Sequence, residues 1–269
     1  MTRFIANARM YAVTPEAEAA WRALLAHVAD DAGVALDYET HPAPQPLDHL
    51  WRRGDLGAVQ MCGYPIALNL AEVIPLAAPI PATAWADGRA VYRSDLIVRA
   101  DSPFATLRDS FGTRLGWTVA HSQSGFNALR HHLLPHARGG PLYAETVGNL
   151  ITARAVLDAV RDGRIDIGPL DAWWHALIAR HRPELTVGVR VLESTALAPI
   201  PAFVASPSLP VEARERLGAA FLGAAARPWF PPLGAALVLA GFAPVNHATY
   251  APTLAWAAEA EAAGYATPA

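Results

Sequence analysis

A chain of 269 residues is long enough to form one large domain or two domains of ordinary size. Its hydrophobic fraction of 53% and charged fraction of 17% exclude a disordered protein, because so much apolar surface can build a core. The net charge of −3 predicts no binding to nucleic acid, so local hydrogen-bond donors must hold any anionic ligand.

The single cysteine and the short apolar runs exclude further classes of protein. Cys62 alone cannot form an intrachain disulfide or a cysteine-based zinc site. The longest apolar run, residues 233–240, is far short of the roughly 20 residues of a membrane span, so we expect no direct membrane insertion. Residues 1–9 lack the apolar core of a signal peptide. The chain as written is therefore expected in the cytoplasm, or in the periplasm if a leader was removed.

The first third of the chain alternates strands and helices. Residues 4–10 predict a strand. Thr14 and Pro15 then begin a helix, because a capping hydroxyl followed by proline is a common helix start, and Gly33 ends it. Further elements are a strand at 34–38, a helix at 46–53 and a strand at 56–61. Such alternation with short connections favours a parallel α/β sheet.

The middle of the chain holds the stretch on which the functional interpretation depends. A long strand is expected at 91–99 and another at 115–120, followed by a polar turn, residues 122–125, that opens a helix. The first N–H groups of a helix lack intrahelical partners, and the helix dipole favours negative charge there. The turn therefore predicts an anion site. Ser122, Gln123 and Ser124 would add donors, and Gly125 would let the backbone approach a ligand. The alternative is that a serine merely caps the helix.

The last part of the chain continues the alternation and then becomes helical. A helix is expected at 153–160 and a strand at 165–170, which ends at Asp171. A helix at 173–179 and strands at 187–192 and 202–205 follow. The remainder is expected to be helical, at 210–225, around 233–239 and at 252–263.

Four pieces of this sequence carry a resemblance to a known family. They are the Gly63-Tyr64 turn, residues 92–109, the strand and Ser-x-Ser-Gly turn at 116–125, and the Asp-Gly-x-x-Asp segment at 155–171. In this order they resemble the phosphate/phosphite/phosphonate-binding proteins of ABC importers, a branch of the type 2 periplasmic binding proteins. The resemblance covers residues 4 to 225, approximately.

The resemblance implies an α/β fold of two lobes, each a mixed, mostly parallel sheet flanked by helices. Carried over, lobe one is residues 1–94 and 195–269, and lobe two is the inserted segment 95–194. The two crossings between the lobes would form a two-strand hinge. In such folds ligands lie between the lobes, at the carboxyl ends of the strands.

The resemblance also implies a solute-binding protein that captures a small oxyanion, such as phosphate, phosphite or a phosphonate, by hinge closure. Its partners would be this small anion and an ABC permease. The matching ligand-binding residues are Tyr11, Tyr64, Ser122, Gln123, Ser124, Gly125 and Asp171. Asp171 would accept a hydrogen bond from a protonated oxygen of the ligand or from a ligand ammonium group. No catalytic residue, cofactor or metal ion is expected.

One departure from the family's pattern and the lack of a leader peptide keep other functions open. Where the family usually has a histidine, this chain reads Thr152-Ala153-Arg154, and Arg154 is either a replacement donor or a solvated residue. The alternative function is a cytoplasmic enzyme or ligand sensor on the same fold, acting on a small carboxylic acid, with Asp171 as its candidate titratable group. The pair His131-His132 with His136 does not predict a metal site, because Pro135 interrupts the helix. Binding is favoured over catalysis.

Overall fold

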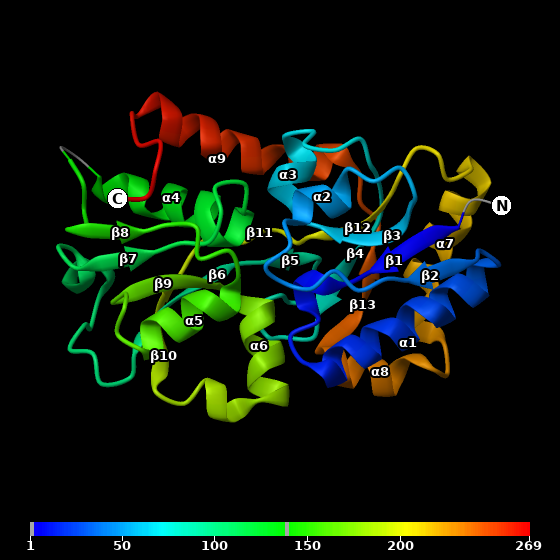
Figure 1. Ribbon diagram of the computed structural model, residues 1–269, viewed down its shortest axis with the longest axis horizontal. Helices are drawn as coiled ribbons and strands as arrows, with labels where there is room; N and C mark the ends of the chain where they lie inside the picture. Colours follow the sequence, from blue (N-terminus) through cyan, green and yellow to red (C-terminus); the bar gives the residue numbers. More distant parts are fainter. Residues whose placement is uncertain (1–2, 138–139) are drawn as a thin grey trace. The chain divides into compact units, whose positions relative to one another are not determined.

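The computed structural model describes residues 3–137 and 140–269, and these divide into two units (Figure 1). Unit 1 is Met1–Val91 with Pro199–Ala251, and unit 2 is Tyr92–Ala198 with Pro252–Ala269. Two of the crossings between units lie in the short strands β5 (Val91–Tyr92) and β11 (Ala198–Pro199), which pair with each other. The third crossing differs from the sequence-based boundaries, which place residues 252–269 in lobe one. In the structure this tail belongs to unit 2.

Unit 1 is built on a six-stranded sheet of order β13-β4-β12-β3-β1-β2. The strands β1, β2, β3 and β4 run in one direction, and β12 and β13 run in the other. Their bounds are β1 Phe4–Asn7, β2 Leu36–Tyr38, β3 Leu56–Met61, β4 Ile74–Pro81, β12 Ala202–Ala205 and β13 Leu239–Ala243. The carboxyl ends of four strands therefore share one edge of this sheet.

Helices cover both faces of the unit 1 sheet (Figure 1). One face carries α1 (Pro15–Ala32), α7 (Val211–Gly223) and α8 (Phe230–Leu237). The other face carries α2 (Leu47–Trp51) and α3 (Gly63–Ala67), whose apolar side chains join a core with β3 and β12. The helix α1 forms as predicted. Thr14 caps it by accepting from the Ala17 N–H at 3.2 Å, and Gly33 ends it at a φ of 60°.

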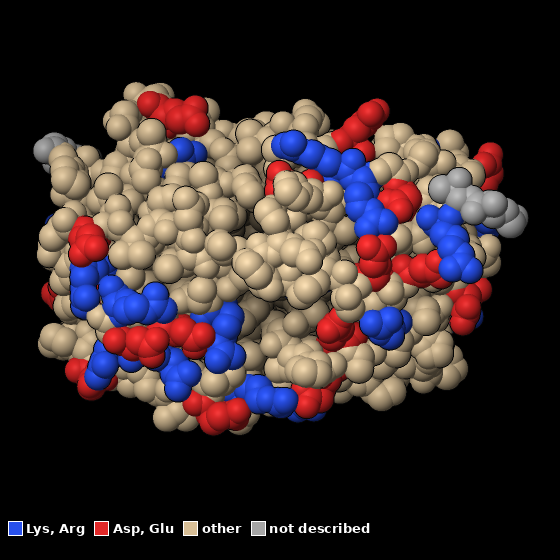
Figure 2. Space-filling view, viewed as in Figure 1, with Lys and Arg blue, Asp and Glu red and all other residues tan. Residues whose placement is uncertain are grey.

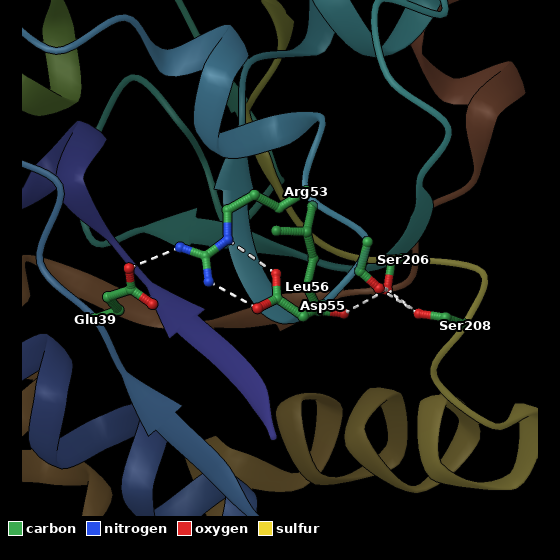
Figure 3. Close-up of polar contacts among 7 residues, drawn as sticks. Glu39, Arg53, Asp55, Leu56, Ser206 and Ser208 are labelled. Carbon is green, nitrogen blue, oxygen red and sulfur yellow. Dashed lines mark hydrogen bonds and ion pairs between the residues drawn. The ribbon is translucent and has the colours of Figure 1, made fainter. Parts of the chain in front are cut away.

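A polar cluster holds the amino end of β3 in unit 1 (Figure 3). Arg53 donates two hydrogen bonds to the Asp55 carboxylate, at 2.9 and 2.7 Å, and a third to Glu39 at 2.7 Å. The Ser206 hydroxyl donates to the Gly54 carbonyl at 2.9 Å and so fastens the end of β12 to the same turn. This cluster lies at the edge opposite the carboxyl ends of the parallel strands, so we assign it a stabilising role.

Unit 2 is built on a five-stranded sheet of order β10-β6-β9-β7-β8. The strands β7, β8, β9 and β10 run in one direction and β6 runs against them. Their bounds are β6 Ser94–Arg99, β7 Arg114–Gly116, β8 Glu145–Val147, β9 Ile167–Asp171 and β10 Val189–Ser194. Helices α4 (Ala128–Leu133) and α9 (Ala251–Ala262) lie on one side of this sheet, and α5 (Ala153–Arg161) and α6 (Ala172–His181) lie on the other (Figure 1).

Several expected elements have other bounds or another form in the structure. The strand expected at 115–120 ends at Gly116, because the Thr118 N–H then bonds to the Gly125 carbonyl of its own loop at 3.2 Å. The helix that the turn at 122–125 was expected to open starts with a π-helical turn, Gln123–Asn127, and becomes α-helical only at Ala128. The C-terminal part is not all helical, since β13 pairs with β4 at the edge of the unit 1 sheet. A short apolar run does not distinguish a buried strand from a buried helix.

Candidate functional site

Three helix starts meet at one edge of the unit 2 sheet. The carboxyl ends of β7, β8 and β9 share this edge, and each strand is followed by a helix whose first residue is capped by a side chain. Ser122 accepts from the Gly125 N–H at 3.0 Å, and Thr152 accepts from the Ala155 N–H at 3.1 Å. Asp171 accepts from the Trp173 and Trp174 N–H groups at 2.9 and 3.0 Å. We call the part of the sheet edge that these three residues line the N-cap edge. The dipoles of the three helices that start there favour an anion.

Residues 122–127, which we call the capping loop, form the centre of the N-cap edge. The Asn127 N–H donates to the Ser122 carbonyl at 3.0 Å, which closes one π-helical turn. Such turns widen the backbone and are frequent at functional sites. Capping uses Ser122 as a hydrogen-bond acceptor, and its hydroxyl proton is not part of that bond. A capping role and a ligand-donating role for Ser122 are therefore compatible.

A close contact inside the loop requires glycine at position 125, and the sequence did not reveal this contact. A Cβ at this position would lie 1.9 Å from Thr118 Oγ1, so no side chain fits there. The loop is further fixed by Ser94, whose hydroxyl donates to the Ser124 carbonyl at 2.7 Å. The close approach at Gly125 therefore involves the protein's own Thr118, while its approach to a ligand stays a prediction.

Gln123 and Asp171, two of the predicted ligand residues, are engaged within unit 2. Gln123 is 0% exposed, and its Oε1 accepts from Asn127 Nδ2 at 2.8 Å. Asp171 is 8% exposed, ends β9 and caps α6 through Oδ1. Capping alone is a sufficient reason for a carboxylate at this position. The structure thus brings Ser122, Gln123, Ser124, Gly125 and Asp171 to one edge of the unit 2 sheet, and their ligand contacts stay a prediction.

A second polar group at this edge was missed by sequence reasoning. The Asp95 carboxylate accepts from Ser194 Oγ at 2.8 Å and lies 3.2 Å from His175 Nδ1. The amino end of β6 and the carboxyl end of β10 meet here, since Ser94 pairs with Asp171, and Ser194 with Asp95. In the sequence, His175 lies 80 positions and Ser194 lies 99 positions from Asp95. No local spacing pattern could have indicated this group.

In unit 1, Tyr11 and Tyr64 follow neighbouring parallel strands. Tyr11 ends a short 3₁₀ turn after β1, and Tyr64 lies in the first turn of α3, after β3, which pairs directly with β1. Both residues are buried, at 1% and 7% exposure. The start of α3 packs tightly, because a Cβ on Gly63 would lie 2.4 Å from the Tyr250 ring. The placement at adjacent strand ends agrees with the prediction, and ligand contact remains to be tested.

Arg154 points along its own helix. Its Nε lies 3.0 and 2.8 Å from the two carboxylate oxygens of Asp158, and 48% of its side chain is exposed. Figure 2 shows basic and acidic side chains adjacent to one another on the face of unit 2 that it presents. All 21 basic residues of the chain are arginines, whose planar guanidinium forks suit such pairs. Arg154 is therefore a half-exposed surface residue paired with Asp158.

The histidines near residues 131–136 pack against side chains from elsewhere in unit 2. His131 stacks on Trp256 at 4.8 Å and lies 2.8 Å from Glu259, and His132 lies 2.9 Å from Glu193. Burial lowers the pKa of His132, although Glu193 opposes this effect. Among the residues that the structure describes, no group of three or more His, Cys, Asp or Glu side chains could hold a metal ion. Within the described part of the chain, no helix combines the length and the hydrophobicity of a membrane span.

Comparison with protein families matches residues 12–250 to the family described as "ABC transporter, phosphonate, periplasmic substrate-binding protein". The chain belongs to this family. It is a solute-binding protein of the phosphonate type, and its family name places such proteins in the periplasm. The resemblance seen in the sequence is thereby confirmed. No curated protein matches the chain significantly.

Solved structures of similar fold include several solute-binding proteins. A binding protein component of an ABC phosphonate transporter from Pseudomonas aeruginosa has a TM-score of 0.80 and 15% identity, over 97% of this chain and 88% of that chain. PhnD1 from Prochlorococcus marinus, in complex with methylphosphonate, has a TM-score of 0.79 and 13% identity, over 97% and 98%. A Xanthomonas citri protein bound to ATP has a TM-score of 0.66 and 20% identity, over 98% of both chains. These likenesses confirm the two-lobed α/β fold.

Proposed function

We propose that this solute-binding protein takes a small phosphorus oxyanion, such as a phosphonate, phosphite or phosphate, in the periplasm and delivers it to an ABC permease. The observation that carries the proposal is the N-cap edge, where three capped helix starts face one edge of the unit 2 sheet in a chain of this family. Helix starts supply N–H donors and positive potential without a formal charge, which suits a small oxyanion.

The predicted ligand residues divide into donors and one acceptor. Ser122, Gln123 and Ser124 supply side-chain donors, and Gly125 keeps the capping loop close to Thr118. Asp171 accepts a hydrogen bond from a protonated ligand oxygen or from a ligand ammonium group. From unit 1, Tyr11 and Tyr64 add phenolic hydroxyls. An acidic acceptor among neutral donors favours the singly charged form of the ligand.

A thermal unfolding panel tests the proposal. The protein, stripped of carried-over ligand by refolding, is mixed with phosphate, phosphite, methylphosphonate, aminoethylphosphonate, sulfate and small carboxylates. A ligand at about 100 times its Kd stabilises the folded state by about 2.7 kcal/mol. We expect a shift with at least one phosphorus oxyanion and none with sulfate. A shift with a carboxylate alone would contradict the proposal and support the alternative of an enzyme or sensor.

A further inference from the structure

The capping loop is tied to the C-terminal tail through one buried side chain. Asn127 is 0% exposed and ends the π-helical turn. Its Nδ2 donates to Gln123 Oε1 at 2.8 Å and to the Thr253 carbonyl at 2.8 Å, and its Oδ1 accepts from Arg130 Nη2 at 3.0 Å. One amide thus contacts the loop, the first turn of α9 and a buried arginine. Among side chains of this size, only an amide offers two donors and an acceptor.

Arg130 extends the same network to the far end of α9. It is 3% exposed, its Nη1 donates to the Ala266 carbonyl at 2.9 Å, and its guanidinium lies 5.3 Å from the centre of the Phe126 ring. The tail beyond α9 is fixed as well, because the Leu142 N–H donates to the Ala269 carbonyl at 2.8 Å. Asn127 and Arg130 therefore hold α9 in its first turn, at Thr253, and the chain just beyond its end, at Ala266.

Burial of apolar surface does not account for this network, because keeping the charge of Arg130 buried costs free energy. Apolar side chains of similar volume would usually pack at least as stably as a buried arginine, even one that has a carboxylate within 4.0 Å, as Arg130 has in Glu261. A hydrogen-bonded polar network, in contrast, favours one arrangement of its members, because each unmet buried bond costs roughly 1–3 kcal/mol. The member that this network orients directly is Gln123, through its Oε1. The arrangement is suited to fixing that side chain.

We propose that Asn127 is a positioning residue for ligand binding, which fixes Gln123 and ties the capping loop to helix α9. This inference rests on the proposed function, since it assigns Gln123 and its loop to the ligand. It makes the C-terminal helix part of the binding apparatus of unit 2. Loss of the Asn127 donors should loosen the loop even where α9 stays in place.

The test uses Asn127→Asp, which keeps the size of the side chain and the acceptor for Arg130 but removes both donors. We expect methylphosphonate, or whichever oxyanion the wild type binds, to bind about tenfold more weakly, as the loss of one bond of about 1.4 kcal/mol predicts. The effect should act through Gln123. In a Gln123→Ala background, Asn127→Asp should therefore weaken binding no further, although it still lowers stability.

A matched control separates positioning from general loosening of the tail. His131 also contacts α9, through Trp256 and Glu259, but no hydrogen bond of its side chain reaches the capping loop. We expect His131→Ala to leave the Kd unchanged. Three results would each overturn the inference. The first is an equal loss of affinity in His131→Ala, and the second is unchanged binding in Asn127→Asp. The third is an additive loss of affinity when Asn127→Asp and Gln123→Ala are combined.

Hydrogen exchange supplies a readout that needs no ligand. The amides of Gly125 and Asn127 bond within the capping loop and should exchange faster in Asn127→Asp, while amides of β9 should keep their wild-type rates. If the wild type binds none of the oxyanions, the proposed function fails, and unchanged exchange at these two amides would then overturn the positioning role as well. If Asn127→Asp does not fold, Gln123→Met removes the same bond from the other side, and its readout is the exchange of the Gly125 and Asn127 amides, since Gln123 itself is assigned to the ligand.

Discussion

The two sheet edges that carry the predicted ligand residues are built in different ways. In unit 1, Tyr11 and Tyr64 are buried aromatic residues beside tight apolar contacts, such as that between Gly63 and the Tyr250 ring. In unit 2, the edge consists of helix caps and polar side chains that bond across distant parts of the chain. Shape therefore sets the unit 1 edge, whereas hydrogen bonding sets the unit 2 edge. Substitutions at the unit 1 edge should therefore change mainly the stability of the protein, and substitutions at the unit 2 edge should change mainly its affinity for the ligand.

The largest effect is expected for Gly63→Ala. The new Cβ would lie 2.4 Å from the fully buried Tyr250 ring, whose hydroxyl donates to the Ile200 carbonyl at 3.1 Å and holds the ring in place. Overpacking of this kind costs about 1–3 kcal/mol in the free energy of unfolding, measured by urea denaturation. The same substitution should cost much less in a Tyr250→Leu background. An equal loss of unfolding free energy in both backgrounds would show that the Tyr250 ring is not the reason for glycine at position 63.

Ser124→Ala should separate affinity from stability in unit 2. The Ser124 carbonyl, not its hydroxyl, accepts from Ser94, so the substitution keeps the bond that fixes the loop. We expect the Kd for the oxyanion, measured by calorimetry, to rise about tenfold, because a donor to a charged group is worth about 1.5 kcal/mol or more. The free energy of unfolding should change by less than about 0.5 kcal/mol. The control Ser102→Ala, beyond the opposite end of β6, removes a 3.3 Å hydrogen bond from the Phe104 N–H but should leave the Kd unchanged. A Ser124→Ala protein with wild-type Kd would remove Ser124 from the site.

Asp171→Asn should change how binding depends on pH. The amide oxygen still accepts from the Trp173 and Trp174 N–H groups, so the cap of α6 is kept. In the wild type, Asp171 favours a protonated ligand oxygen, so affinity should fall as the pH rises through the second ligand pKa, which is near 6 for a phosphomonoester. In the variant, affinity should no longer fall over this range. Identical pH profiles of the Kd in both proteins would exclude contact between Asp171 and the ligand.

The smallest effect concerns the opposite edge of the unit 2 sheet. Arg114 donates to both carboxylate oxygens of Asp166 at 2.9 Å, and these hydrogen bonds hold the pKa of Asp166 below its usual range. The stabilisation is therefore present above the unfolded pKa of about 3.9 and is lost as the pH falls through the lower folded pKa.

Asp166→Asn should lower the free energy of unfolding at pH 7 by about 1 kcal/mol, since the pair is partly exposed and screened. The difference from wild type should shrink as the pH falls below about 3.9 and vanish below the folded pKa. Urea denaturation at pH 7 and pH 3 measures it, and ligand affinity should stay unchanged. A difference that grows toward low pH would contradict the assigned direction of the pKa shift.

Several elements could be predicted from the sequence because their signals are local. Thr14, Pro15 and Gly33 bound α1 where the caps predicted, and the strands β3 and β12 have the predicted bounds. Each of these signals depends on a few neighbouring residues. The capping loop was likewise found from its turn residues and the helix that follows, although its π-helical form was not.

Non-local contacts decided the rest of the molecule. The strand β13 exists because β4 pairs with it, and the tail after Ala251 belongs to unit 2 because Asn127 and Arg130 bond to the carbonyls of Thr253 and Ala266. Asp95 likewise contacts His175, 80 positions away in the sequence, and Ser194, 99 positions away. The order of residues along the chain determined the family and the α/β alternation, and it predicts an anion site at the turn of residues 122–125, because caps, turns and hydrophobic period act within a few residues. Only the tertiary structure decided which side chains orient that turn, because hydrogen bonds between distant segments leave no pattern in local spacing.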